Sequence, residues 1–164
     1  MISVVVTIRT PEWFPPRIRD VTVTVKKPAP IDIQHLDHLV LTVADIEQTI
    51  AFYRDVLGMT SIVFGEGRRA LAFGRQKINL HEAGRELLPH ATSPLPGSAD
   101  FCFIVGSSLA ATIDHLRELG VEIEQGPVVK TGALGPITSL YIRDPDGNLI
   151  ELSVYSTNDD RGGD

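Results

Sequence analysis

Two stretches decide the fold of this chain, LDHLVLTVADIEQTIAFYRDVLG (36–58) and SADFCFIVGSSLAATIDHLRELG (98–120). Each begins with a short strand-like run, continues with apolar residues at helical spacing, and ends in a glycine. The two glycines, Gly58 and Gly120, are 62 positions apart, and the same offset holds at the start of the unit. Self-similarity at a fixed offset is typical of a duplicated structural unit. Each stretch therefore predicts a strand followed by a helix.

The sequence that follows each stretch repeats as well. An edge-like strand comes first, followed by a two-strand hairpin whose second copy has a turn one residue longer. The segments are TSIVFG (60–65) and ALAFGRQKINLH (70–81) in the first copy, and VEIEQG (121–126) and SLYIRDPDGNLIE (139–151) in the second. The order strand, helix, three strands occurs twice. We therefore expect an α+β fold of two tandem βαβββ modules that form a curved, cup-shaped mixed sheet with the helices outside.

The modules, at about 33–83 and 98–155, form a single expected domain over residues 31–156. Residues 1–30 stand apart, because ISVVVTI and VTVTV alternate like strands and KKPAP reads as a stiff linker. We expect an N-terminal arm or hairpin there, and a polar tail at 157–164.

Composition limits the classes of function. The 164-residue chain is 43% hydrophobic with a net charge of −6, which suits neither nucleic acid nor an anionic membrane surface. No apolar run approaches the ~20 residues that span a bilayer, and the first residues do not resemble a signal peptide, so we expect a cytoplasmic protein. Cys102 is the one cysteine, which excludes an intrachain disulfide and a cysteine-rich zinc site. A metal would be bound through nitrogen and oxygen.

Ligand-type side chains lie on one face of four expected strands. Because side chains alternate along a strand, each of these strands has an apolar face and a mixed face. The mixed faces carry His38 and Asp100 in the first strand of each module, and His81 (in KINLHEAG) and Glu151 (in NLIELSVY) in the last. We interpret His38 and Asp100, and likewise His81 and Glu151, as equivalent positions. Pairing of the two sheets about a pseudo-twofold axis would bring all four to one centre.

Two imidazoles and one or two carboxylates suit a divalent first-row metal, namely Fe, Mn, Ni, Co or Zn. Asp100 either ligates the metal or accepts the second N–H of a ligand histidine. Tyr141, Arg143 and Cys102 share the mixed faces and are the candidates to contact a substrate. The segment 81–100 is rich in Pro and Gly and is expected to form a rim over the cup, where Arg85 and His90 are further substrate contacts.

The motifs LDHLVLTVADIEQTIAFYRDVLGM, INLHEAG and YIRDPDGNLIELS resemble the vicinal oxygen chelate superfamily, the grouping of glyoxalases, bleomycin-resistance proteins and extradiol dioxygenases. The resemblance covers about residues 33–155 and is strongest to short stand-alone glyoxalase-domain proteins. It implies metal ligands at His38, His81 and Glu151, and it leaves Asp100 undecided as a fourth. It also implies a homodimer and a small-molecule substrate that chelates the metal through vicinal oxygens.

The expected activity is a metal-dependent lyase or isomerase of glyoxalase type, in which Glu151 or Asp100 transfers the proton. An extradiol-type Fe(II) dioxygenase is the alternative, since two histidines and one carboxylate suit iron and oxygen. A thiol transferase that confers antibiotic resistance ranks third, because the sequence shows no basic cluster for a phosphonate. A non-catalytic drug-binding protein is the remaining alternative.

Overall fold

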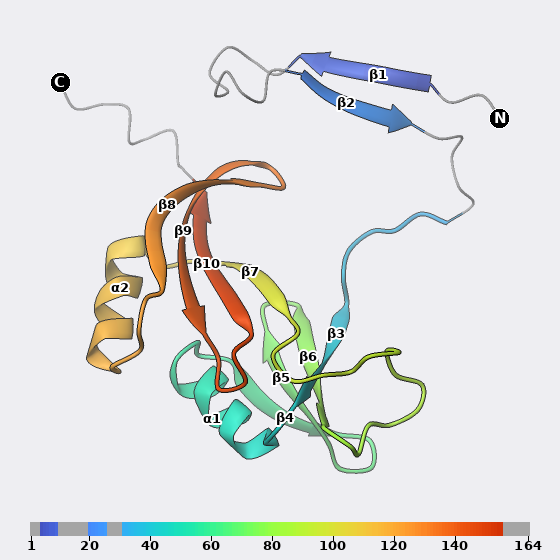
Figure 1. Cartoon of the computed structure of the whole chain (residues 1–164), viewed down its shortest axis with the longest axis vertical. Helices are drawn as coiled ribbons and strands as arrows, with labels where there is room; N and C mark the ends of the chain where they lie inside the picture. Colours follow the sequence, from blue (N-terminus) through green and yellow to red (C-terminus); the bar gives the residue numbers. More distant parts are fainter. Residues whose placement is uncertain (1–3, 10–19, 26–30, 156–164) are drawn as a thin grey trace. The chain divides into compact units, whose positions relative to one another are not determined.

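The computed structural model describes residues 4–9, 20–25 and 31–155 of the chain (Figure 1). The chain divides between His35 and Leu36 into two units. In the first unit, β1 (Val4–Arg9) and β2 (Asp20–Val25) form an antiparallel ladder from Val4↔Val25 to Arg9↔Asp20. The expected turn, linker and tail segments (10–17, 26–30 and 157–164) lie outside the described residues. None of the described helices is long and apolar enough to span a bilayer.

The second unit contains two modules of the same construction. The first consists of β3 (His38–Val43), α1 (Ile46–Asp55), β4 (Thr60–Phe64), β5 (Arg68–Phe73) and β6 (Gln76–Glu82), with sheet order β3-β6-β5-β4. The second consists of β7 (Asp100–Ile104), α2 (Leu109–Glu118), β8 (Gln125–Gly132), β9 (Gly135–Arg143) and β10 (Leu149–Tyr155), with order β7-β10-β9-β8. In each module the first strand pairs with the last in parallel and the remaining pairs are antiparallel. The α+β class and the tandem βαβββ modules are confirmed, as two four-stranded mixed sheets.

Local chemistry explains why each helix begins and ends where it does. The Asp45 carboxylate accepts the Gln48 N–H (2.9 Å), and the Ser108 hydroxyl accepts the Ala111 N–H (3.2 Å), as expected for N-caps. After each helix the chain turns at a glycine with φ of +67°, a left-handed backbone conformation that costs other residues energy. This shared requirement is why both copies of the repeat end in glycine.

The edge strand expected at residues 121–126 is wrong in position, because β8 begins at Gln125. Val121 and Ile123 are partly buried against the core without belonging to a strand. The Val121 N–H bonds the Leu116 carbonyl at the end of α2 (2.9 Å) instead of a neighbouring strand. The alternation of apolar and polar residues after α2 therefore reflects alternating burial against the core and not a strand.

The apolar faces of both sheets contribute to one hydrophobic core with the helices. Ile78 and Leu80 of β6 and Ile150 and Leu152 of β10 are almost fully buried within it. Further contact between the modules comes from the rings of Phe73 and Phe103, whose centroids are 5.2 Å apart. The opposite face of each sheet, which we call the inner face, carries the mixed side chains.

One buried polar contact joins the modules. The turn between β9 and β10 lies against α1 (Figure 1), where the fully buried Tyr53 hydroxyl donates to the Asp144 carboxylate (3.0 Å). Asp144 also accepts the backbone N–H groups of Asp146 and Asn148 and the Asn148 side-chain amide. Burial and the carboxylate raise the pKa of Tyr53, so the phenol remains protonated and acts as a donor.

We expect Tyr53→Phe to lower the free energy of unfolding by about 2 kcal/mol, because it leaves a buried carboxylate short of one donor. Chemical denaturation monitored by circular dichroism measures the change. Tyr155→Phe is the matched control, since the Tyr155 hydroxyl accepts only the exposed Leu134 N–H (3.2 Å), and it should cost about 0.5 kcal/mol or less. Equal losses in the two variants would contradict a special role for the buried contact.

Candidate functional site

The parallel ladders define which inner-face residues are equivalent in the two modules. In the first module His38 pairs with Lys77, and Val40, two positions after His38, pairs with Asn79. In the second module Asp100 pairs with Leu149, and Cys102, two positions after Asp100, pairs with Glu151. Asn79 is therefore the equivalent of Glu151, and His38 is the equivalent of Asp100.

The expected equivalence of His81 with Glu151 is wrong by two residues. His81 pairs with Thr42, whereas the corresponding ladder position in the second module is Ser153, paired with Ile104. The sequence comparison equated His81 with Glu151 because each is the ligand-type residue at the end of its hairpin. The hydrogen-bonded ladders instead make Asn79 the equivalent of Glu151.

A single chain does not bring His38, His81 and Glu151 to one point. The register separates His38 from His81 by four residues on neighbouring strands, which is about 13 Å along the sheet. Among the described residues, no three His, Cys, Asp or Glu side chains lie close enough together to hold an ion. The four equivalent positions form two pairs, His38 with Asn79 and Asp100 with Glu151, one on each sheet.

Glu151 is the most unusual group on the inner face of the second module. Its Oε1 atom is buried and has no hydrogen-bond partner. Tyr141 lies opposite Glu151 in the antiparallel ladder, and burial together with a hydrogen bond to the Glu151 carboxylate raises the pKa of Tyr141 to about 12. The phenol thus lies beside the carboxylate, whose Oε1 has no hydrogen-bond partner.

The other expected contacts around Glu151 have different surroundings. Cys102 pairs with Glu151 across the ladder, its Sγ lies 3.5 Å from the Ser153 hydroxyl, and burial raises the pKa of the thiol. Asp100 is exposed at the beginning of β7. The Arg143 guanidinium is bound by the Glu124 carboxylate at 2.6 and 2.9 Å, so it is engaged by an anion of the segment that precedes β8.

Asn79 is the inner-face residue that sequence reasoning missed. Its Oδ1 atom is buried without a hydrogen-bond partner, as is Oε1 of its equivalent, Glu151. Each module thus has one buried oxygen without a hydrogen-bond partner at the same ladder position, Asn79 in the first and Glu151 in the second. Aligning the hairpins by strand pairing would have identified Asn79 from the sequence.

His38 is prepared to ligate through one nitrogen. Its side chain is 44% exposed, and Nδ1 lies 2.6 Å from the Asp37 carboxylate. An ionised carboxylate can only accept, so Nδ1 donates to Asp37, and Nε2 is the ring nitrogen left to bind an ion. A carboxylate behind a histidine is the arrangement that orients metal-binding imidazoles.

His81 lies under the rim, in a cavity of about 540 Å³. The floor of this cavity is formed by residues 40–42 of β3, and its roof by the rim residues, including His90 and Leu95. The Nδ1 atom of His81 is buried without a partner, and burial lowers the pKa of the imidazole. His81 is thus a neutral polar group that faces a small chamber. Arg85, the other expected rim contact, is bound to Glu82 (3.1 Å).

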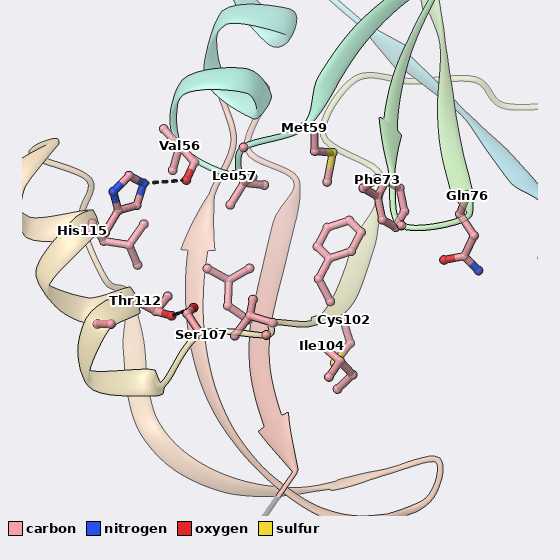
Figure 2. Close-up of a pocket in the computed structure, with 18 residues that line it drawn as sticks. Val56, Leu57, Met59, Phe73, Gln76, Cys102, Ile104, Ser107, Thr112 and His115 are labelled. Carbon is pink, nitrogen blue, oxygen red and sulfur yellow. Dashed lines mark hydrogen bonds between the residues drawn. The ribbon is translucent and has the colours of Figure 1, made fainter.

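A second cavity, of about 790 Å³, is lined by residues of both modules (Figure 2). Of the residues expected to form the site, it contains Cys102 alone. Its polar side chains are already engaged. His115 bonds the Val56 carbonyl (3.0 Å), and Ser107 bonds Thr112 (2.9 Å), as Figure 2 shows. Its walls are mainly apolar, and it lacks the unpaired oxygens found on the inner faces.

Comparison with known proteins agrees with this architecture. Residues 35–152 match the model of the Glyoxalase/Bleomycin resistance protein/Dioxygenase superfamily, and the chain belongs to this family. It is 54% identical over 125 residues to the glyoxalase domain-containing protein RDO1 of Mycosarcoma maydis, covering 76% of this chain and 70% of that protein.

The chain is also 53% identical over 123 residues to the virulence protein STM3117 of Salmonella typhimurium, covering 75% of this chain and 85% of that protein. The crystal structure of STM3117 superposes with a TM-score of 0.76 and covers 77% of this chain and 100% of that one. A more distant relative is the metallothiol transferase FosB of Staphylococcus epidermidis, 26% identical over 132 residues, or 79% of this chain and 87% of that protein.

We expect the pKa of Tyr141 to fall below 12, toward the usual value near 10, in Glu151→Gln. Loss of the carboxylate removes both its negative charge and its hydrogen bond, whereas burial of the phenol remains. A pH titration of tyrosine ring carbons by NMR measures the shift. Glu124→Gln is the matched control, because Glu124 is a carboxylate of the same module that binds Arg143. An equal shift in that variant would contradict the assignment.

Proposed function

We propose that this protein is a metal-dependent enzyme of glyoxalase type, a lyase or isomerase whose substrate chelates the ion through vicinal oxygens. The observation that carries the proposal is the buried, unpartnered Oε1 of Glu151, opposite Tyr141 on the inner face of the second module. A buried carboxylate oxygen without a partner is costly unless a cation or a donor arrives. The donor set fits a divalent first-row metal.

The ladders favour a revised ligand set. His38 and Glu151 are retained from the sequence prediction, and Asp100, the equivalent of His38, takes the third position in place of His81. Asn79 is the fourth equivalent, and its amide oxygen either completes the coordination or orients a bound water. One imidazole and two carboxylates suit Mn, Fe, Co, Ni or Zn. A bound ion would act as a Lewis acid toward the substrate oxygens.

We further propose that the site forms between two chains of a homodimer. His38 and Glu151 lie on separate sheets, and both sheets expose apolar side chains on their inner faces, with Val40 49% and Ile104 52% exposed. Exposed apolar surface of this kind is typical of an interface. The inner face of the first module from one chain would then face that of the second module from its partner.

The proposed chemistry needs a group that moves a proton between neighbouring carbons of the substrate. Glu151 and Asp100 are the carboxylates at the site, and Glu151 is positioned by a phenol that stays protonated below pH 12. The neighbouring Cys102 thiol stays protonated because burial raises its pKa, so we assign it a contact role.

Two alternatives differ in their support. An Fe(II) dioxygenase with two histidines and one carboxylate needs His38 and His81 at one ion, and the β3–β6 register separates them by four residues within a chain. Thiol transfer is the second candidate, and its support is the 26% identity to a metallothiol transferase. Thiol-dependent turnover with an electrophilic substrate, absent without added thiol, would favour it over isomerisation.

We expect His38→Ala and Glu151→Ala each to lose bound metal by a factor of at least about ten, because each removes a direct ligand. Elemental analysis after loading with Mn, Fe, Co, Ni or Zn and desalting provides the measurement. Glu124→Gln and His115→Gln are the controls and should retain metal. Full metal content and full turnover in both alanine variants would refute the metal site.

A mixing experiment tests whether the site is shared. The His38→Ala and Glu151→Ala chains are unfolded together, refolded and loaded with metal. Half of the dimers are then mixed, and if ligands come from both chains each mixed dimer has one intact site, so about a quarter of the wild-type metal content should return. A site contained within one chain predicts no recovery. Sedimentation velocity on the same samples establishes the dimer.

A further inference from the structure

The inner face of the first module carries two cationic side chains at a single aromatic ring. The Nζ atom of Lys77 lies 3.9 Å from the centroid of the Phe64 ring, and the Cζ atom of Arg68 lies 4.4 Å from it. Both positive charges are therefore held beside one ring. Arg68 is also close enough to His81 to disfavour protonation of that imidazole.

The strand registers place this cluster on the same face as His38. Lys77 pairs with His38 across the β3–β6 ladder, and Phe64 pairs with Arg68 across the β4–β5 ladder. Between β6 and β4 lies β5, whose inner-face residues include the small side chains Ala70 and Ala72. The Lys77 side chain crosses this strand to reach the ring, and Ala70 is fully buried. The cluster therefore lies over the inner face of β5.

No carboxylate of the described residues forms an ion pair with either cation. Most other arginines of the described module residues form an ion pair with an acidic side chain, namely Arg54, Arg69, Arg85, Arg117 and Arg143. The exception among them is Arg75, in the β5–β6 turn. Cation–π contacts stabilise each charge separately, but they do not cancel the repulsion between two neighbouring positive charges. A bound anion would remove this repulsion.

We propose that Arg68 and Lys77 form an oxyanion subsite that binds the carboxylate or phosphonate group of a small substrate beside the catalytic centre. The inference rests on the proposed function, because it assigns to the same inner face the part of the substrate that does not chelate the metal. The planar guanidinium binds an oxyanion through two N–H groups, and the ammonium adds a point charge. The Phe64 ring supplies an apolar wall for the adjoining carbon atoms.

The cluster places two cations on the inner face of the first module. The second module carries Asp100 and Glu151, together with Lys130 at 5.5 Å from the centroid of the Tyr141 ring and the Glu124-bound Arg143. A substrate with an anionic end and a metal-chelating end would place the anionic end at Arg68 and Lys77 and the chelating end toward Asp100 and Glu151. Arg143, the cation that the sequence suggested for an anionic substrate, is neutralised by Glu124 and is less suited to this task.

The test uses the full chain, ¹⁵N-labelled and stripped of metal by chelation, titrated by NMR with benzoate, phenylphosphonate and the neutral benzyl alcohol. We expect the two anions to shift the backbone resonances around Phe64, Arg68 and Lys77, and benzyl alcohol to leave them unchanged. Tighter binding of benzoate identifies a carboxylate subsite, and tighter binding of phenylphosphonate a phosphonate subsite. Equal shifts from benzyl alcohol, or none from either anion, would overturn the proposal.

The variants Arg68→Gln and Lys77→Met, singly and together, should weaken anion binding, the double variant by at least about tenfold. Arg75→Gln removes a cation from the neighbouring turn and should leave binding unchanged. The NMR spectra show whether each variant is folded. If the double variant does not fold, the anion affinities of the two single variants test the proposal. Equal weakening by Arg75→Gln would reduce the effect to net charge and overturn the subsite.

Metal content separates this proposal from the proposed function. The double variant should lose the anion and retain the metal. Undiminished anion binding in the double variant would overturn the oxyanion subsite and leave the metal centre untouched. A wild-type chain that takes up no metal but binds the anion through Arg68 and Lys77 would overturn the metal centre and preserve the subsite.

Discussion

The parallel pairing of the first strand with the last strand of each module is the constraint on which the rest of the structure depends. Side chains opposite each other in a ladder lie on the same face, so the register alone decides which residues are neighbours on the inner face. A shift of one residue would send Ile78 and Leu80, or Ile150 and Leu152, out of the core. Burial of the apolar face therefore fixes the positions of Asn79 and Glu151.

The duplication made most of the fold predictable from the sequence. Alternation predicted the strands beginning near His38 and Asp100, helical spacing predicted both helices, and the caps at Asp45 and Ser108 follow from side-chain chemistry. The prediction failed for the strand after α2, where burial alternates but the backbone bonds the helix end. Hydrogen-bond pairing is a property of the tertiary structure, and a local pattern does not contain it.

The candidate site was less predictable, because it depends on pairing between segments far apart in sequence. His38 and Glu151 were found because ligand-type side chains stand out in apolar strands. Asn79 was missed because it lies two residues from the more conspicuous His81, and the hairpins have turns of different length. Arg68 and Lys77 are ordinary charges nine positions apart, and only the fold of β4, β5 and β6 brings both to the Phe64 ring.

The inner faces carry features that a fold selected only for stability would avoid. Oxygen atoms of Asn79 and Glu151 and a nitrogen of His81 are buried without partners, and each such atom costs about 1–3 kcal/mol. Three of them amount to a large share of the net stability of a domain. Between α1 and the β9–β10 turn, by contrast, the buried Tyr53 hydroxyl and Asp144 carboxylate form a hydrogen bond with each other. A fourth buried atom without a partner, Arg69 Nε, lies on the helix side, where the Arg69 guanidinium pairs with Glu47 of α1. The three unpaired atoms of Asn79, Glu151 and His81 lie on the inner faces, and they support the proposal that a ligand and a partner chain complete this side of the sheets.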